Sequence, residues 1–235
     1  MSNKHGRRLF VAGVGAVMLV AACTTTQQAK VEQADIKCGF LGPVCSQLKT
    51  GAPGQQIAWL YTNPAVDWTK YKKLMLQPVT YWDDQNSKVS VENQHRLTNF
   101  LYATLEQELA KQFQLVDQDG PDVMQLQVAL IDVAAATPGL RTITMVIPQA
   151  RVLATLKRGV TDSYPFVGGA QAEFKLTDSL TGQVLAAGVD RRIGGGNIST
   201  AAQWEWGDAE NVMKAWSKLA ADRLSAWTKG MAKPA

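Results

Sequence analysis

The sequence predicts an α+β fold in which two amphipathic helices cover one face of a mainly antiparallel sheet. Residues 90–115 and 208–229 repeat apolar side chains at helical spacing. Residues 123–133 alternate apolar and polar side chains, as a half-buried strand does. Residues 172–178 and 183–190 flank a short Gly-containing turn and predict a hairpin. This order of strand, helix, several strands and helix favours a layered α+β domain.

The first 22 residues have the three parts of a secretory signal peptide. Lys4, Arg7 and Arg8 form a positive region without an acidic neighbour, and residues 9–22 are uncharged and mostly apolar. As a helix this run would span only about 21 Å, whereas the core of a bilayer is about 30 Å thick. A permanent transmembrane anchor is therefore the weaker alternative.

The signal is followed by a cysteine in a characteristic setting. The stretch Val20-Ala21-Ala22-Cys23 resembles the lipobox of bacterial lipoproteins, in which the cysteine is acylated and becomes the first residue. The resemblance implies a lipid anchor on Cys23, because several acyl chains hold a protein stably at a membrane. The alternative is an ordinary signal peptide with a cysteine nearby. Since Thr24 replaces the Asp of an inner-membrane retention signal, we expect an outer-membrane, periplasm-facing protein, with the inner membrane as the weaker alternative.

Polar residues after Cys23 predict how the anchor is joined to the domain. Residues 23–35 lack periodicity and are expected to form a lipidated, flexible tether. Residues 36–235 are expected to form a single periplasmic α+β domain, which is long enough to bury a core. Within it, the Gly- and Pro-rich residues 38–57 predict an irregular strap. Residues 71–82 predict a first strand, in which Pro78 indicates an edge position or a bulge.

The remaining elements follow in order. Ser90 is the expected N-cap of the helix at 90–115. Residues 142–147 and 152–156 are either two further strands or an excursion over the sheet. The Gly-Gly-Gly-Asn run at 194–197 predicts a mobile loop before the last helix.

Charge and histidine content exclude several function classes. The chain has 24 Lys and Arg and 20 Asp and Glu, but three of the basic residues and no acid lie in residues 1–22, so the remainder carries a net charge of +1. No electrostatic footprint for nucleic acid remains. Of the two histidines, His5 belongs to the signal, so His95 alone argues against a His-rich metal site and a Ser-His-Asp triad. We expect His95 on a solvated helix face, and no metal or cofactor.

Two cysteines remain once Cys23 is acylated. In an oxidising periplasm, Cys38 and Cys45 predict one disulfide. Gly42 and Pro43 between them supply the turn that a short closure needs. Two free thiols are the alternative, whereas a redox pair would need CxxC spacing.

Three stretches carry a resemblance to a known family. They are Cys38-Gly39-Phe40-Leu41, the phrase YTNPAVDWTKY at 61–71 and the phrase LQPVTYW at 76–82. They resemble the proteobacterial lipoproteins of domain of unknown function 3313, and the similarity extends through Asp190-Arg191-Arg192 to the last helix. Family members usually have a tyrosine after Gly-Phe-Leu, whereas this chain has Gly42 there, followed by Pro43, Val44 and Cys45. The resemblance therefore implies that the disulfide is a local feature of this chain. The family has no established activity, so the resemblance implies no catalytic residue.

Trp82 and Asp83 are the first candidate contacts for a ligand. An aromatic ring beside the acids Asp83 and Asp84 could hold a sugar or serve acid/base chemistry. The alternative is a solvated turn after a strand, since side chains that are neighbours in sequence usually diverge. The same acids would be the starting point for a carboxylate-based hydrolase.

Two further pairs could bind a ligand or partner. Arg191 and Arg192 could bind a carboxylate or phosphate, or one could pair with a surface acid while the other is solvated. Trp204 and Trp206 could anchor a partner protein if they are exposed, or could cap the core. The sequence therefore predicts a lipid-anchored, non-enzymatic structural or interaction module of the envelope with no assigned catalytic residue. Its partners would be the membrane and an envelope protein or glycan. A glycan- or lipid-binding module is the alternative, and a hydrolase is the weakest one.

Overall fold

The computed structural model describes residues 26–52, 56–82, 89–135, 168–194, 206–232 and 234. Several sequence predictions fall outside these ranges. They concern the signal peptide with Cys23, the acids Asp83 and Asp84, residues 142–147 and 152–156, most of the Gly-Gly-Gly-Asn run, and Trp204.

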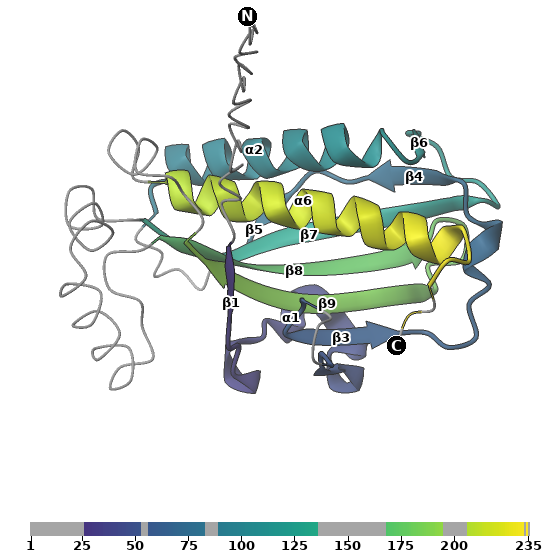
Figure 1. Cartoon of the computed structure of the whole chain (residues 1–235), viewed down its shortest axis with the longest axis horizontal. Coiled ribbons are helices and arrows are strands. Elements are labelled where there is room, and N and C mark those ends of the chain that lie inside the picture. Colours follow the sequence, from purple (N-terminus) through teal and green to yellow (C-terminus); the bar gives the residue numbers. More distant parts are fainter. Residues whose placement is uncertain are drawn as a thin grey trace, which may run out of the picture.

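The described chain begins with short helices and strands, and its long helices and strands follow from Val91 onward (Figure 1). In order, the elements are β1 (Gln27–Ala29), η1 (Gln33–Asp35), α1 (Cys38–Leu41), η2 (Gly42–Gln47), β2 (Lys49–Thr50), β3 (Trp59–Thr62), η3 (Trp68–Lys70), β4 (Lys73–Leu76), β5 (Thr80–Tyr81), α2 (Val91–Leu109), β6 (Gln114–Leu115), β7 (Val123–Ala134), β8 (Gly169–Asp178), β9 (Val184–Ile193) and α6 (Gly207–Thr228).

All strands in the described ranges join one sheet of order β2-β3-β9-β8-β7-β4-β6, with β1 on β9 and β5 on β7. The pairs from β2 to β7 are antiparallel, whereas β4 and β5 run parallel to β7 and β6 runs parallel to β4. Helices α2 and α6 lie side by side over one face (Figure 1). The predicted fold class, a mainly antiparallel sheet covered by two amphipathic helices, is confirmed.

The two faces of the sheet have separate cores. Side chains of α2, α6 and strands β7 to β9 form the larger cluster, which includes Leu101, Leu130 and Met213. On the opposite face, Val31 and Leu41 belong to a smaller cluster over β9. They come from residues 30–48, called the N-terminal strap here, which contains η1, α1 and η2. Because successive side chains of a strand point to opposite faces, β9 contributes to both clusters, with Leu185 in the larger one and Val189 in the smaller one.

The first described residues differ from the predicted tether. Gln27–Ala29 pair antiparallel with Arg191–Ile193 of β9 as strand β1, and η1 follows at Gln33–Asp35. Residues 27–35 are therefore part of the fold rather than of a flexible tether. A strand of three residues is too short to show an alternating pattern, so β1 could not be predicted from its sequence.

The predicted strand at 71–82 is interrupted. It forms β4 and β5, which pair with successive parts of β7. The backbone N–H groups of Gln77 and Trp82 still donate to carbonyls of β7, at 2.9 and 2.8 Å. Pro78 has no N–H to donate, so regular pairing stops between the two strands. The break confirms that Pro78 disturbs the ladder, although β4 lies inside the sheet and not at its edge.

Helix α2 begins where the sequence predicts and ends earlier. The Ser90 side chain accepts a hydrogen bond from the backbone N–H of Asn93 at 3.3 Å, as an N-cap does. The helix ends at Leu109 rather than Leu115. Residues Gln114–Leu115 instead form β6, because they pair with the outer edge of β4.

Candidate functional site

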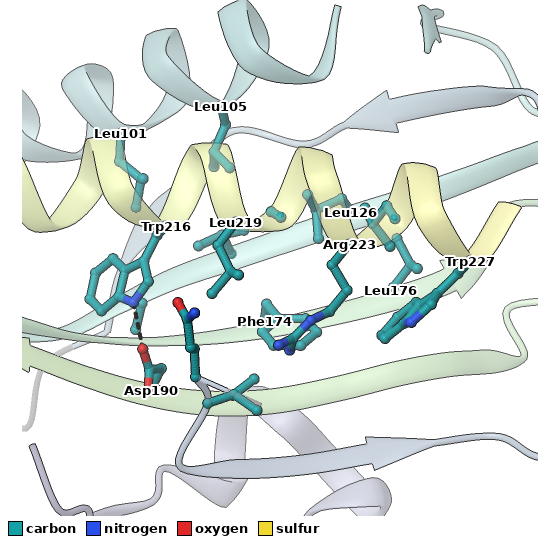
Figure 2. Close-up of a pocket in the computed structure, with 16 residues that line it drawn as sticks. Leu101, Leu105, Leu126, Phe174, Leu176, Asp190, Trp216, Leu219, Arg223 and Trp227 are labelled. Carbon is teal, nitrogen blue, oxygen red and sulfur yellow. Dashed lines mark hydrogen bonds between the residues drawn. The ribbon is translucent and has the colours of Figure 1, made fainter. Parts of the chain in front are cut away.

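A cavity of about 100 Å³ lies between α6, α2 and the sheet (Figure 2). Leu101 and Leu105 of α2 form one wall, and Leu126 of β7 and Phe174 of β8 form another. Its lining is apolar except for a few groups, which include Asp190 of β9. An apolar space with a few converging polar groups is the usual form of a ligand site, so it is the candidate functional site.

Helix α6 positions this cavity because it carries two adjoining apolar stripes. One stripe packs into the main core and includes Val212, Met213 and Ala221. The second lines the cavity and consists of Trp216, Leu219, Ala220, Arg223, Leu224 and Trp227. These positions recur at intervals of three and four residues, so they lie on one side of the helix. Arg223 is the charged member of that stripe.

Asp190 is buried at the sheet side of the cavity, with 6% of its surface exposed. Its carboxylate accepts hydrogen bonds from Trp216 Nε1 at 2.8 Å, Arg192 Nε at 2.8 Å and Gln28 Nε2 at 2.9 Å. Burial raises the pKa of Asp190 above its ordinary value, although these three partners oppose the shift. The carboxylate therefore joins α6, β9 and β1 at one point.

Arg192 and Arg191 have different roles because they point to opposite faces of β9. The buried Arg192 guanidinium also donates to Thr26 Oγ1 at 3.2 Å and to the carbonyl of Gln56 at 2.7 Å. Arg191 lies 3.5 Å from Asp35 and 3.9 Å from Asp132. The expectation that one arginine of the pair is solvated was wrong: Arg192 is a buried structural link.

Arg223 is half-buried beside this cluster. Its guanidinium carbon lies 6.0 Å from the centroid of the Trp227 ring. Burial lowers the pKa of Arg223, Asp190 opposes that shift, and Arg192 adds to it. Arg223 and Asp190 thus both line the cavity, and Arg192 is bound to Asp190.

Trp206 lies in the core and is only 6% exposed. It precedes the first turn of α6, and its Nε1 has no hydrogen-bond partner among the described residues. The alternative that this tryptophan caps the core therefore holds, and its ring is not available to a partner protein.

Trp82 is 40% exposed and lies against the N-terminal strap. Its ring contacts Phe40 edge to face, with centroids 6.0 Å apart, and Lys175 Nζ lies 5.6 Å from the centroid of Phe40. The sequence singled out Trp82 together with Asp83, which lies outside the described ranges. The structure instead places Trp82 beside Phe40, which is 42 residues away in sequence and gave no signal as its neighbour.

Polar side chains of β8 hold the strap on the sheet. The backbone N–H of Lys37 donates to Glu173 Oε1 at 2.6 Å, and Gln171 Nε2 donates to the carbonyl of Asp35 at 2.9 Å. Glu173 is fully buried, and its Oε2 has no partner in the described chain. Burial raises the pKa of Glu173 to about 7, although the Lys37 N–H opposes the shift.

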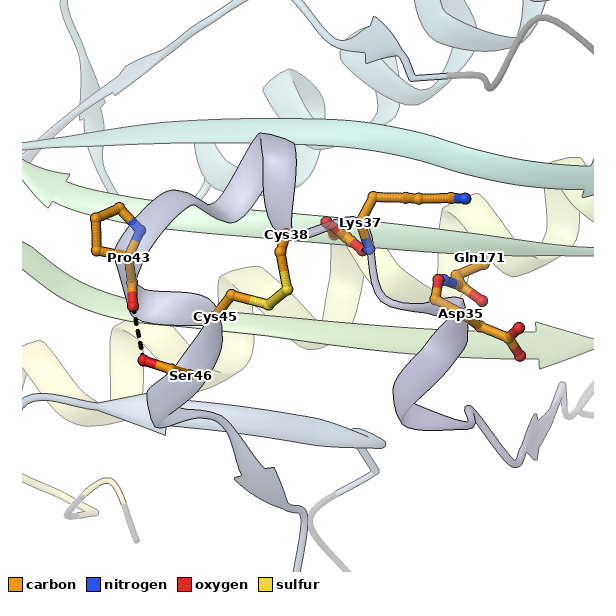
Figure 3. The surroundings of a disulfide bond; sticks show 8 residues. Asp35, Lys37, Cys38, Pro43, Cys45, Ser46 and Gln171 are labelled. Carbon is orange, nitrogen blue, oxygen red and sulfur yellow. Dashed lines mark hydrogen bonds between the residues drawn. A yellow bond between two sulfur atoms is a disulfide. The ribbon is translucent and has the colours of Figure 1, made fainter.

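The predicted disulfide is present between Cys38 of α1 and Cys45 of η2 (Figure 3). The two Cα atoms lie 5.4 Å apart, within the usual range for a disulfide. Ser46 Oγ donates to the carbonyl of Pro43 at 3.0 Å inside the same turn. The bond closes the strap above the polar side chains of β8.

The described residues that line the cavity include few ionisable side chains. Asp190 is the single carboxylate among the described residues that line it, whereas a glycosidase needs two. Within the described ranges, no cluster of three or more metal-ligating side chains occurs, and no helix could cross a bilayer. His95 is exposed on α2, as expected for a solvated helix face.

Comparisons with known proteins identify a family but no activity. The family model described as "Protein of unknown function (DUF3313)" matches residues 37–220. No curated protein matches the chain.

Three solved structures illustrate the similarities of fold. The PelC dodecamer from Paraburkholderia phytofirmans is 12% identical over 68% of this chain and 95% of that chain, with a TM-score of 0.36. The hypothetical protein CT253 from Chlamydia trachomatis is 8% identical over 68% and 99%, with a TM-score of 0.41. Protein XCC0632 from Xanthomonas campestris, of family DUF330, is 10% identical over 73% and 94%, with a TM-score of 0.37. At this level the similarities carry no argument about function.

Proposed function

The chain belongs to the DUF3313 family, and we propose that it is a lipid-anchored bacterial envelope lipoprotein that acts by binding and not by catalysis. Its domain would face the periplasm. The proposal is supported by the signal and lipobox pattern that ends at Cys23, by the disulfide between Cys38 and Cys45, and by an apolar cavity whose described lining includes one carboxylate.

The observation that carries the proposal is the short distance along the chain from Cys23 to the sheet. Strand β1 begins at Gln27, four residues after the cysteine. Four residues reach at most about 14 Å even when fully extended. Acyl chains on Cys23 would therefore hold the sheet against the membrane surface. This position suits a protein that binds a membrane component or a neighbouring envelope protein.

Metabolic labelling with a palmitate analogue tests the anchor. The wild-type chain, expressed in a Gram-negative host, should carry the label and sediment with outer membranes. Cys23→Ala should lose the label and leave the outer-membrane fraction. The matched control is the double variant Cys38→Ser/Cys45→Ser, which removes the other two cysteines and should keep both label and location. Labelling that persists in Cys23→Ala, or an unlabelled wild type, would contradict the proposal.

A second candidate function is that of a lipid-binding module, and the cavity between α6 and the sheet favours it. The glycan alternative rests on Trp82, whose ring is partly exposed beside Phe40. Retention of the protein on peptidoglycan, lost in Trp82→Ala and kept in Ala220→Leu, would favour the glycan. Retention on lipid-coated beads that is lost in Ala220→Leu and kept in Trp82→Ala would favour lipid binding in the cavity. A partner protein would be found by cross-linking in cells.

A further inference from the structure

The cavity between α6 and the sheet is small and mostly apolar. Its volume of about 100 Å³ compares with about 150 Å³ for an engineered apolar cavity that stays dry and binds benzene. Sites for whole drug-sized ligands are larger, at about 300–1,000 Å³. Ala172 of β8 lines the cavity from the sheet and Ala220 of α6 lines it from the helix, and their short side chains leave the space between them unfilled. The cavity therefore has the size and polarity for a section of one hydrocarbon chain.

Filling this space with hydrocarbon is favourable. The side chains around an unfilled apolar cavity lose contacts on one side, and water does not replace those contacts. Leu101 and Leu105 of α2 and Phe174 of β8 are among the side chains concerned. A hydrocarbon chain would restore their contacts and would remove its own surface from water.

The first described residues lie beside the cavity. Gln28 Nε2 donates a hydrogen bond at 2.9 Å to Asp190, which lines the cavity (Figure 2). The Arg192 guanidinium donates to Thr26 Oγ1 at 3.2 Å and to the carbonyl of Gln56 at 2.7 Å. Gln56 also lines the cavity and is exposed. A single guanidinium group therefore separates Thr26 from the exposed side of the cavity.

Cys23 is close enough along the chain for an acyl group to reach this side. It precedes Thr26 by three residues, which span at most about 11 Å when fully extended. One acyl chain covers half of a bilayer core of about 30 Å, so it is about 15 Å long. Attachment to Cys23 would also keep the acyl group near the cavity, at an effective concentration on the order of millimolar.

We infer that one acyl chain on Cys23 occupies the cavity between α6 and the sheet of its own protein, while the other acyl chains on that residue stay in the membrane. The inference rests on the proposed lipid anchor and states where one of its chains lies. The position of Thr26 favours this source over an acyl chain of a membrane lipid, which has the same chemistry.

Photo-cross-linking in outer membranes tests the inference. The full-length protein is labelled in cells with a palmitate analogue that carries a diazirine in the middle of its chain. Light then joins the analogue to whatever lies beside it. In the wild type, peptide mass spectrometry should find the acyl group of Cys23 joined to the peptides of α6 or β8 that line the cavity. The product should have the mass of a monomer.

Two variants fill the cavity from opposite walls. Ala220→Leu acts from the helix and Ala172→Leu acts from the sheet, and each should lose the cross-link. Ala103→Leu is the matched control, because it adds the same side chain to an exposed position of α2 and should keep the cross-link. Melting followed by circular dichroism checks that each variant is folded before the yields are compared.

The outcomes separate the occupant of the cavity from the anchor. A labelled Cys23 without a cross-link to the cavity peptides would overturn the inference and leave the lipid anchor intact. A cross-link that persists in both cavity-filling variants, or that occurs only between two chains, would have the same consequence. So would cavity peptides that are joined only to lipids not attached to the chain. An unlabelled Cys23 would remove the anchor and the inference together.

Discussion

Trp216 Nε1 of α6 donates a hydrogen bond to Asp190 Oδ2 of β9 at 2.8 Å, at the edge of the apolar cavity (Figure 2). This contact fixes the helix that forms the outer wall to the strand that forms the floor. The same carboxylate oxygen accepts from Arg192. The cavity is thus framed by a buried polar network, whose partners come from distant parts of the chain.

Trp216→Phe should destabilise the protein by about 2 kcal/mol, because it removes a hydrogen bond to a buried charged group. Urea unfolding followed by circular dichroism measures the loss. Trp59→Phe is the matched control, since Trp59 Nε1 donates at 2.9 Å to the neutral carbonyl of Val31. That change should cost only about 1 kcal/mol. An equal or greater loss in the control would contradict the role assigned to Asp190.

Glu173 should make the protein less stable as the pH rises. Its pKa is about 7 in the folded protein and 4.5 as the ordinary value, so the folded state keeps a proton that the unfolded state releases. The free energy of unfolding should therefore fall by about 3 kcal/mol between pH 4.5 and pH 7.5 and then level off. Glu173→Gln cannot ionise and should remove this part of the pH dependence. Urea unfolding of both proteins at pH 5 and pH 8 measures the effect. The prediction is refuted if Glu173→Gln loses as much stability as the wild type between these two pH values.

Asp178 should act in the opposite direction. Burial alone would raise the pKa of its carboxyl, but hydrogen bonds from Lys70, Thr181 and Tyr71 hold the pKa well below the ordinary 3.8. Its stabilising contribution is therefore complete above pH 3.8 and is lost as the pH falls through the lower folded-state value.

Asp178→Asn tests this contribution. The variant should lose about 2 kcal/mol of stability at pH 7, and progressively less in more acidic buffer. Asp222→Asn breaks the exposed contact with Lys218 and should change stability by no more than about 0.5 kcal/mol. Thermal or urea unfolding across the acid range provides the measurement. A loss at Asp178 that is independent of pH would show that its charge is not what matters.

The disulfide should stabilise the strap by a measurable amount. The chain-entropy model gives about 2.5 kcal/mol for a loop as short as that between Cys38 and Cys45. The double variant Cys38→Ser/Cys45→Ser should lose this amount relative to the oxidised wild type, and should match the wild type after reduction. If reduction leaves the wild-type unfolding curve unchanged, the bond does not stabilise the domain.

The parts of the fold with strong local periodicity could be predicted from the sequence. Helices α2 and α6, strand β7 and the β8–β9 hairpin have a continuous apolar face, so their type and approximate bounds are encoded within each segment. By contrast, Gln171 and Glu173 alternate with apolar neighbours in the pattern of a solvated strand face. The strap covers that face, and nothing in the local sequence of β8 indicates it.

The candidate site was missed for a similar reason. The sequence indicated Arg192 as an anion contact, but its partners Thr26 and Gln56 are more than 100 residues away along the chain. Hydrogen bonds between residues so far apart in the chain cannot be recognised from the spacing of residues in the sequence. One signal was present: Arg223 lies seven residues after Trp216, on the same stripe of an otherwise apolar helix face. A charged residue at such a position is a reason to look for a polar partner or a ligand.

The most direct test of the account is the mass of the N-terminal peptide of the protein purified from bacterial outer membranes. We expect a peptide that begins at Cys23 and carries fatty acyl groups on that residue. A peptide that begins elsewhere and carries no fatty acid would contradict it.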